Sequence, residues 1–338
     1  MIGDQNAIFG DMENRLYNPF DNFSFDNKTC FLSGVALEKP LFYSVFPEWI
    51  VEEYNIGDQP FKMLDESYKN YNDLKLPCSE RVFERLSNLD EQVRIAFTQG
   101  YKGVKALESE LLFQWIAKWV YGIIFNEIQA GISQQMLSGE PLNFSQTLVH
   151  KFKNLHIMLQ SLIMETEYET VLPFSLLVVE VDNPENTYNY RDEINTLVYS
   201  LRIKNLGIIA CLQDNGANLR YHKDILSLVK DQKLHPIQFE ELCGGFFYSC
   251  YLFNRLPDYM VSSLDGKVYI EPMPLVGVNS RPVFDHFQAK TYGQVLENFW
   301  KPWGYTLFEI IRDPENPMSF IKDESGEFIP IDKLVLPS

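Results

Sequence analysis

The sequence predicts an α+β protein whose second half is richer in antiparallel sheet than its first. Two observations carry this prediction: apolar residues recur at helical spacing through much of residues 81–162, and short apolar runs bounded by turn residues follow from residue 174. The 338 residues are 46% hydrophobic, which is enough apolar material for one large core or two moderate ones. We expect an irregular lead-in over residues 1–27, an ordered unit over 28–100 and an α+β domain over 101–338.

The helices are predicted from the 3.6-residue period. Residues 1–27 are rich in Asp and Asn and show no period, whereas Arg81–Thr98 places its apolar residues on one face and stops at Gly100. We place the seam between the two units near residues 100–103. A long helix is expected within Leu107–Ile132, and Ser145 is a typical N-cap for the next one.

The strands are predicted from short apolar runs. Phe174–Val181 has strand length and lies between Pro173 and a turn-like segment. Residues 196–203 fit both an alternating strand and a helix, and we interpret them as a strand. Leu206–Gln213 is apolar and ends at Asp214-Asn215-Gly216, which predicts a hairpin turn; Asp265-Gly266 and Ser325-Gly326 repeat the signal.

One further apolar helix is expected at Ile237–Leu256, with Gly244-Gly245 inside it. Glycines in a helix let a neighbouring segment approach closely, and packing explains them better than phosphate binding because no GxGxxG turn follows a strand here.

Charge and cysteine content limit the classes of function. Lys and Arg number 29 against 46 Asp and Glu, a net charge of −17, so nucleic acid is a disfavoured partner. Five separated cysteines favour free thiols in a reducing compartment. Met1–Gly10 has no signal-peptide pattern, and charged residues interrupt the most apolar helix, so we expect a cytoplasmic protein without a membrane span.

Three segments of the ordered unit carry a resemblance. Cys30-Phe31-Leu32-Ser33-Gly34, then Ser44-Val45-Phe46-Pro47-Glu48-Trp49-Ile50, then Pro77-Cys78-Ser79-Glu80-Arg81-Val82 follow one another in order. Together they resemble the HNH-endonuclease family of treble-clef folds, in which a CxxC knuckle precedes a His-containing segment, a second CxxC-Asn and a helix. The resemblance covers about a quarter of the chain and implies a treble-clef skeleton.

The zinc ligands that the resemblance implies are incomplete. Zinc in this family takes four thiolates, but the second member of each pair is Ser33 or Arg81. A serine hydroxyl is a poor zinc ligand at neutral pH, and a guanidinium does not deprotonate to coordinate a metal. We therefore expect no zinc and no other cofactor.

The catalytic residues are also replaced. Ser44 stands where the family has its catalytic His, Tyr43 where a Glu usually precedes it, and Val82 where the second CxxC is followed by Asn. Serine is not a general base near pH 7. If the skeleton survives, Cys30, Ser33, Cys78 and Arg81 converge, and the Arg81 charge replaces part of the metal's charge. Its expected partners are carbonyls or carboxylates, with Glu48, Glu80 and Glu84 nearby in sequence.

Other polar residues suggest an alternative site in the second domain. Glu180 and Asp182 end a predicted strand and could hold Mg²⁺, although a solvated strand end explains them as well. Asp214 stands near His222, and His235 precedes Pro236 and two glutamates, which first-turn helix chemistry also explains. His150 and His156 do not share a helix face, and Cys243 and Cys250 fit core packing.

Two functions follow from these patterns. The first is a non-catalytic protein that binds a protein or a small molecule and keeps an inactivated HNH-like scaffold for its shape. The alternative is a metal-dependent hydrolase or nuclease that uses Glu180, Asp182, Asp214, His222 or His235. A cavity that gathers at least three of these five residues distinguishes the second function from the first.

Overall fold

The protein has an α+β fold, seen here in a computed structural model that describes residues 16–138, 145–277 and 280–336. Its chain forms two compact units. Unit 1 comprises the chain up to Arg94, Glu110–Thr170 and Asp258–Met273, and unit 2 comprises Ile95–Ser109, Val171–Pro257 and Pro274–Ser338. Each unit is therefore built from three segments, whereas the sequence suggested a single cut near residues 100–103. The first fifteen residues of the predicted lead-in lie outside the described residues.

Unit 1 combines small sheets with long helices. Its elements are β1 (Leu41–Ser44), α2 (Glu48–Glu53), β2 (Pro60–Lys62), β3 (Tyr68–Asn70), η1 (Tyr71–Asp73), β4 (Lys75–Cys78), α3 (Glu80–Thr98), α5 (Ser109–Ser138), α6 (Gln146–Leu159), η2 (Gln160–Leu162), β5 (Thr166–Tyr168), β11 (Tyr259–Leu264) and β12 (Lys267–Pro272). β1 pairs antiparallel with β4 and β2 with β3, while β12 lies between β11 and β5.

The three helices predicted for the first half are confirmed. α3 ends before Gly100, whose φ of +62° is a left-handed conformation that favours glycine. The Ser145 side chain accepts a hydrogen bond from the Leu148 amide and begins α6 as an N-cap. α5 forms the core of unit 1, with Trp115 and Trp119 fully buried.

Close packing around α5 explains a glycine that the sequence did not single out. A Cβ on Gly122 would lie 2.7 Å from the Val45 side chain, so the small residue lets α5 approach the segment after β1. The ring of Phe46 meets Trp119 edge-to-face, with centroids 5.1 Å apart. Among the described residues, no helix is both long and apolar enough to cross a membrane.

Unit 2 combines a five-stranded sheet with helices. Its elements are α4 (Gly100–Lys105), β6 (Ser175–Val181), β7 (Asn189–Glu193), β8 (Val198–Ile203), β9 (Leu206–Cys211), α7 (Ala217–Tyr221), α8 (Lys223–Val229), β10 (Lys233–Leu234), α9 (Pro236–Leu252), α10 (Ala289–Phe299), η3 (Lys301–Trp303), α11 (Leu307–Ile310) and η4 (Ile331–Lys333). The strand order is β10-β6-β9-β8-β7, antiparallel except for the parallel β10–β6 pair.

The predicted strands of unit 2 are confirmed, but the prediction of a hairpin turn at Asp214-Asn215-Gly216 is wrong. The turn between β8 and β9 is instead Lys204-Asn205, because Ile203 pairs with Leu206. Residues 214–216 lead into α7, whose N-cap is Gly216 in a left-handed conformation, and the Asp214 carboxylate accepts hydrogen bonds from the amides of Gly216 and Asn218. The hairpin at Asp265-Gly266 is confirmed by the pairing of Leu264 with Lys267.

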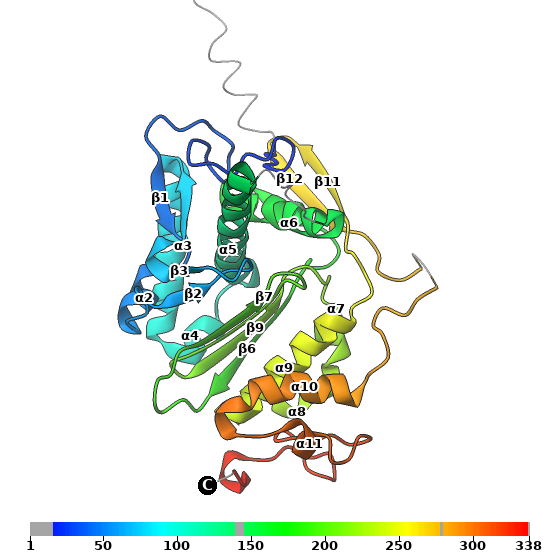
Figure 1. Ribbon diagram of the computed structural model, residues 1–338. Helices are drawn as coiled ribbons and strands as arrows, with labels where there is room; N and C mark the ends of the chain where they lie inside the picture. The colour runs from blue at the N-terminus through cyan, green and yellow to red at the C-terminus, as the bar shows by residue number, and fades with distance from the viewer. Residues whose placement is uncertain (1–15, 139–144, 278–279, 337–338) are drawn as a thin grey trace, which may run out of the picture. The chain divides into compact units, whose positions relative to one another are not determined.

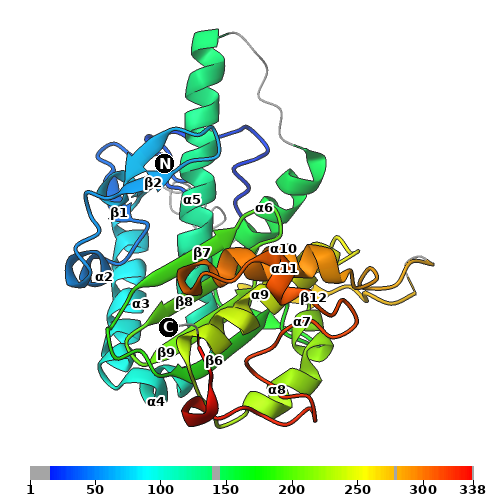
Figure 2. The same ribbon diagram turned by 60° about the horizontal axis from the view of Figure 1, so that its bottom comes forward.

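Helix α9 packs against the sheet, with α10 beside it (Figures 1 and 2). His235 is its N-cap, with Pro236 at the first helical position, and the His235 and Gln238 side chains form a reciprocal capping box. A Cβ on Gly244 would lie 2.7 Å from a methyl group of Leu296, so close packing between α9 and α10 accounts for this glycine.

Candidate functional site

In unit 1, Cys30 lies in a tight turn whose hydrogen bonds fix the start of the predicted knuckle. The Cys30 amide donates to the Val35 carbonyl at 2.8 Å, and the Gly34 amide donates to the Cys30 carbonyl at 3.0 Å. Gly34 has a φ of +71°, a left-handed conformation that this reversal requires. The Phe31 amide then donates to the Pro77 carbonyl at 2.9 Å, which joins this turn to β4.

Cys78 ends β4 directly before α3 and is buried, as is Cys30. Burial is the main cause that raises the pKa of the Cys78 thiol to about 12, and the neighbouring Cys30 adds to the effect. The Cys78 thiol donates to the Leu41 carbonyl at 3.6 Å. Both thiols are thus held in a small antiparallel framework that a helix follows.

Ser33 and Arg81 occupy the positions where the resemblance implies two zinc-binding thiolates, and neither side chain replaces a thiolate as a metal ligand. The Ser33 hydroxyl is buried and makes no hydrogen bond within the described part of the chain. The Arg81 guanidinium donates to the Ile163 carbonyl at 3.0 Å. This partner is a carbonyl, one of the two expected kinds, and it comes from a distant part of the sequence. Among the described residues, no group of three or more His, Cys, Asp or Glu side chains is placed to hold a metal ion.

The side chains at the expected catalytic position form an internal polar network. Ser44 accepts from the Lys75 ammonium at 2.8 Å and donates to the Glu48 carboxylate at 3.2 Å. The Tyr43 hydroxyl donates to Asp90 at 2.5 Å, and the fully buried Lys118 ammonium lies 3.2 Å from the same carboxylate. Val82 is buried in the core.

These contacts place a cation of the protein itself beside the expected catalytic position. Burial lowers the pKa of Lys118, and the Asp90 carboxylate offsets part of that effect. The Lys118 ammonium also lies 5.2 Å from the centroid of the Tyr43 ring, within cation–π range. Lysine, tyrosine and aspartate pair with one another here, and a cavity of about 370 Å³ beside them is lined by Ser44, Glu48 and Asp90.

In unit 2, a cavity of about 370 Å³ lies beside α9, and we call it the α9 cavity. Aromatic side chains form much of its wall, and a few polar groups interrupt them. Its lining includes Tyr221, His222, Glu241, Gly245, Tyr248 and Tyr292, together with the loop 315–322. A cavity of this size with mostly apolar walls and few polar groups is typical of small-molecule sites.

Glu241 holds the loop that forms part of this cavity wall. One carboxylate oxygen accepts from the Ser319 hydroxyl at 2.6 Å, and the other accepts from the amides of Phe320 at 2.6 Å and Ile321 at 3.2 Å. Burial raises the pKa of Glu241 to about 7, and these hydrogen bonds limit the rise. The sequence contains Glu241 beside Glu240 but gives no sign that it contacts residues 319–321.

His222 is joined to Asp214 through two other side chains. The His222 ring bonds to the Ser249 hydroxyl at 2.8 Å, and Ser249 donates to the Asn218 side-chain oxygen at 2.6 Å. The Asn218 amide nitrogen donates to Asp214 at 2.9 Å. Burial lowers the pKa of His222 to about 4, and the backbone of Gly245 offsets only part of this effect.

The remaining residues of the predicted hydrolase site do not line the α9 cavity. Glu180 lies on β6, Asp182 pairs with Lys233 at 2.7 Å, and His235 accepts from the Ile237 amide as the N-cap of α9. Of the five named acids and histidines, only His222 is in the cavity wall. Asp214 is buried outside the cavity lining, and its carboxylate accepts hydrogen bonds from Ser175 and Asn218.

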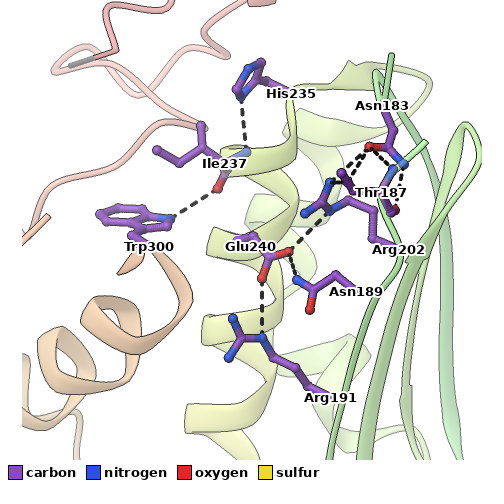
Figure 3. A network of polar contacts seen from close by, with 9 residues as sticks. All are labelled: Asn183, Thr187, Asn189, Arg191, Arg202, His235, Ile237, Glu240 and Trp300. Atoms are coloured by element: carbon purple, nitrogen blue, oxygen red, sulfur yellow. Dashed lines mark hydrogen bonds and ion pairs between the residues drawn. The ribbon is translucent and has the colours of Figure 1, made fainter. Parts of the chain in front are cut away.

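A second buried network in unit 2 joins α9 to the sheet (Figure 3). The Glu240 carboxylate accepts from Asn189 at 2.7 Å, and it lies 3.4 Å from the Arg202 guanidinium and 3.7 Å from that of Arg191. Arg202 also donates to the Thr187 hydroxyl at 2.8 Å. Arg191 and Arg202 are on the neighbouring strands β7 and β8. Arg202 lies in the predicted strand 196–203, whereas the strand that carries Arg191 was not predicted.

No known protein family, curated protein or solved structure matches this chain.

Proposed function

We propose that this protein binds a small molecule in the α9 cavity and is not a catalyst, with unit 1 keeping an HNH-like skeleton as an inert scaffold. The observation that carries the proposal is the α9 cavity itself, whose volume of about 370 Å³ and aromatic wall suit a small ligand. Two of its polar groups, His222 and Glu241, are already held by hydrogen bonds to the protein. Such groups orient a ligand more readily than they transform it.

The scaffold part of the proposal rests on unit 1. The Cys30 turn, the antiparallel β1–β4 pair and α3 come in the chain order expected of a treble clef, and the backbone bond from Phe31 to Pro77 joins the first two. Ser33 and Arg81 stand in place of two thiolates, and Ser44 in place of the catalytic His. The alternative hydrolase has weaker support, because only one of its five residues lines the α9 cavity.

Ligand binding is tested by screening a panel of small aromatic and aliphatic compounds for a rise in melting temperature. The matched variants are Gly245→Leu and Gly245→Ala. A Cβ at this position would meet the His222 ring at 3.4 Å, an ordinary contact, so alanine is tolerated while the longer leucine fills the cavity. We expect stabilising compounds for the natural protein and for Gly245→Ala, and a loss of that stabilisation in Gly245→Leu. Equal stabilisation of both variants would place the binding elsewhere and refute the proposal.

The scaffold is tested separately by elemental analysis of the purified protein. We expect less than one zinc ion per ten chains, because two thiols without two further donors bind zinc weakly. One zinc ion per chain in the natural protein, and none in the Cys30→Ser variant, would overturn the view that unit 1 is metal-free.

A further inference from the structure

The hydrogen bonds behind the α9 cavity begin at Asp214. Its carboxylate accepts from the Ser175 hydroxyl at 2.6 Å, the Asn218 backbone amide at 2.7 Å and the Gly216 amide at 3.1 Å. It also accepts from the Asn218 side-chain amide at 2.9 Å. Because a carboxylate accepts and an amide nitrogen donates, the Asn218 nitrogen faces Asp214, and its side-chain oxygen Oδ1 faces the other way.

The orientation of Asn218 decides the role of Ser249. The Ser249 hydroxyl lies 2.6 Å from Asn218 Oδ1 and 3.0 Å from the Phe246 carbonyl oxygen, and both of these atoms only accept. A hydroxyl has one proton, which is used toward one of them. Toward His222 Nε2, at 2.8 Å, the Ser249 oxygen therefore acts as an acceptor, and Nε2 carries the proton.

The role of Ser249 in turn fixes the state of His222 at the cavity wall. The ring is uncharged at neutral pH, because burial lowers its pKa to about 4. An uncharged imidazole has a single N–H, and that N–H is at Nε2, so Nδ1 keeps its lone pair. The ring stacks on Phe246, with centroids 4.5 Å apart and planes 27° apart, which holds its orientation.

We propose that the α9 cavity selects an uncharged aromatic or heteroaromatic ligand that donates an N–H or O–H hydrogen bond to Nδ1 of His222. This inference rests on the proposed function and names the class of its ligand. The rings of Tyr221, Tyr248 and Tyr292 supply stacking surface for a flat compound. The charged residues in the wall, Glu241 and Glu315 against Lys322, give no excess of positive charge, and an uncharged His222 adds none, so the cavity favours no anion.

The test compares indole with 1-methylindole, which has the same ring system but no N–H donor. We expect the natural protein to bind indole about tenfold more tightly by calorimetry, because one hydrogen bond is worth about 1 kcal/mol and an acceptor left without its donor adds to the difference. In His222→Phe, which keeps a ring at this wall, we expect the ratio to fall to about one through weaker indole binding. Ser249→Ala, which removes the acceptor for Nε2–H, is expected to reduce the ratio as well.

A second measurement keeps the inference testable if a variant does not fold. In the natural protein, ¹⁵N NMR of His222 at pH 7 is expected to show the uncharged ring with its proton on Nε2. A proton on Nδ1, a charged ring, or equal binding of the two compounds would overturn the inference while leaving the proposed function intact. The proposed function itself fails if no compound of the wider panel binds in a way that Gly245→Leu abolishes.

Discussion

At the scale of single residues, burial shifts two side chains of the α9 cavity wall toward their uncharged forms. Glu241 has its pKa raised to about 7 and His222 has its pKa lowered to about 4, and desolvation is the largest cause in both cases. The part of the wall that these two residues form therefore carries less charge than its residue types suggest, while Glu315 and Lys322 line the cavity as well. This matters for binding, because a wall surface of low charge favours uncharged ligands.

The raised pKa of Glu241 predicts a pH dependence of stability. The folded protein binds this proton more tightly than the unfolded chain does, so its contribution is full below pH 4.5 and is lost as the pH rises toward 7. We expect the free energy of unfolding to fall by about 1.5 kcal/mol between pH 5.5 and 7 through this group, because the slope of about 1.36 kcal/mol per pH unit halves at the pKa. Urea unfolding at these two pH values measures the change.

Glu241→Gln is the matched variant, since its amide has the same shape, does not titrate and bonds both to Ser319 and to the backbone amides. The buried histidines His156 and His222, each with a pKa lowered to about 4, act in the opposite sense below pH 6.5, but they are common to both proteins. The difference between the two proteins thus isolates Glu241. Parallel stability curves would show that its pKa is not raised.

At the scale of elements, buried charges join helices to their neighbours in both units. In unit 1 the Lys118 ammonium on α5 pairs with Asp90 on α3, and in unit 2 Glu240 on α9 pairs with arginines on β7 and β8. A buried pair contributes little net stability, but removing one partner leaves an uncompensated charge. These pairs therefore define which helix face meets which partner.

For unit 1 we expect Asp90→Ala to lower the free energy of unfolding by about 3–5 kcal/mol, because the fully buried Lys118 loses its counter-charge. The control is the double variant Asp90→Asn with Lys118→Met, which removes both charges and keeps an acceptor for the Tyr43 hydroxyl. It is expected to stay within about 1.5 kcal/mol of the natural protein. If the double variant is as unstable as Asp90→Ala, charge is not the cause.

For unit 2 we expect Glu240→Ala to cost about 3–5 kcal/mol, because it leaves Arg191 and Arg202 without a carboxylate (Figure 3). Asn189→Ala is the control, since it removes a single hydrogen bond to the same carboxylate and is expected to cost about 1 kcal/mol. Chemical unfolding followed by the fluorescence of the buried Trp300 of unit 2 gives both values. Similar losses in the two variants would contradict a dominant role for the charges.

Local patterns predicted the elements well, and their failures have physical reasons. The 3.6-residue period and the Ser145 cap predicted α3, α5 and α6. In α3 and α6 one face is buried, whereas α5 is buried nearly all round over residues 112–128. The hairpin signal at Asp214-Asn215-Gly216 failed, because the Asp214 carboxylate accepts from the Gly216 and Asn218 amides where α7 begins, and sequence alone does not distinguish a hairpin turn from a turn that leads into a helix. Long-range pairs such as Glu241 with Ser319 have no periodic signature at all.

At the scale of the whole molecule, the chemistry of the candidate sites is divided between the units. The sequence pointed to unit 1 through Cys30 and Cys78, whose surroundings in the structure contain no third donor among the described residues. The α9 cavity escaped prediction because its wall draws on α8, α9, α10 and the loop 315–322, segments spread over about a hundred residues. Only tertiary packing brings such segments together.

The net charge of −17 gives the last prediction, which separates an inactivated scaffold from a working nuclease. DNA binding by unit 1 has to overcome the field of the whole molecule, which repels phosphates. We expect no binding of a 20-base-pair duplex at micromolar protein in 150 mM salt, and no cleavage with added Mg²⁺ or Zn²⁺. Fluorescence anisotropy and gel electrophoresis measure the two. Binding that weakens steeply between 50 and 200 mM salt would reveal a local basic surface. Cleavage that Lys75→Ala abolishes would show that the position of Ser44, to which Lys75 donates a hydrogen bond, is catalytic and would contradict the prediction.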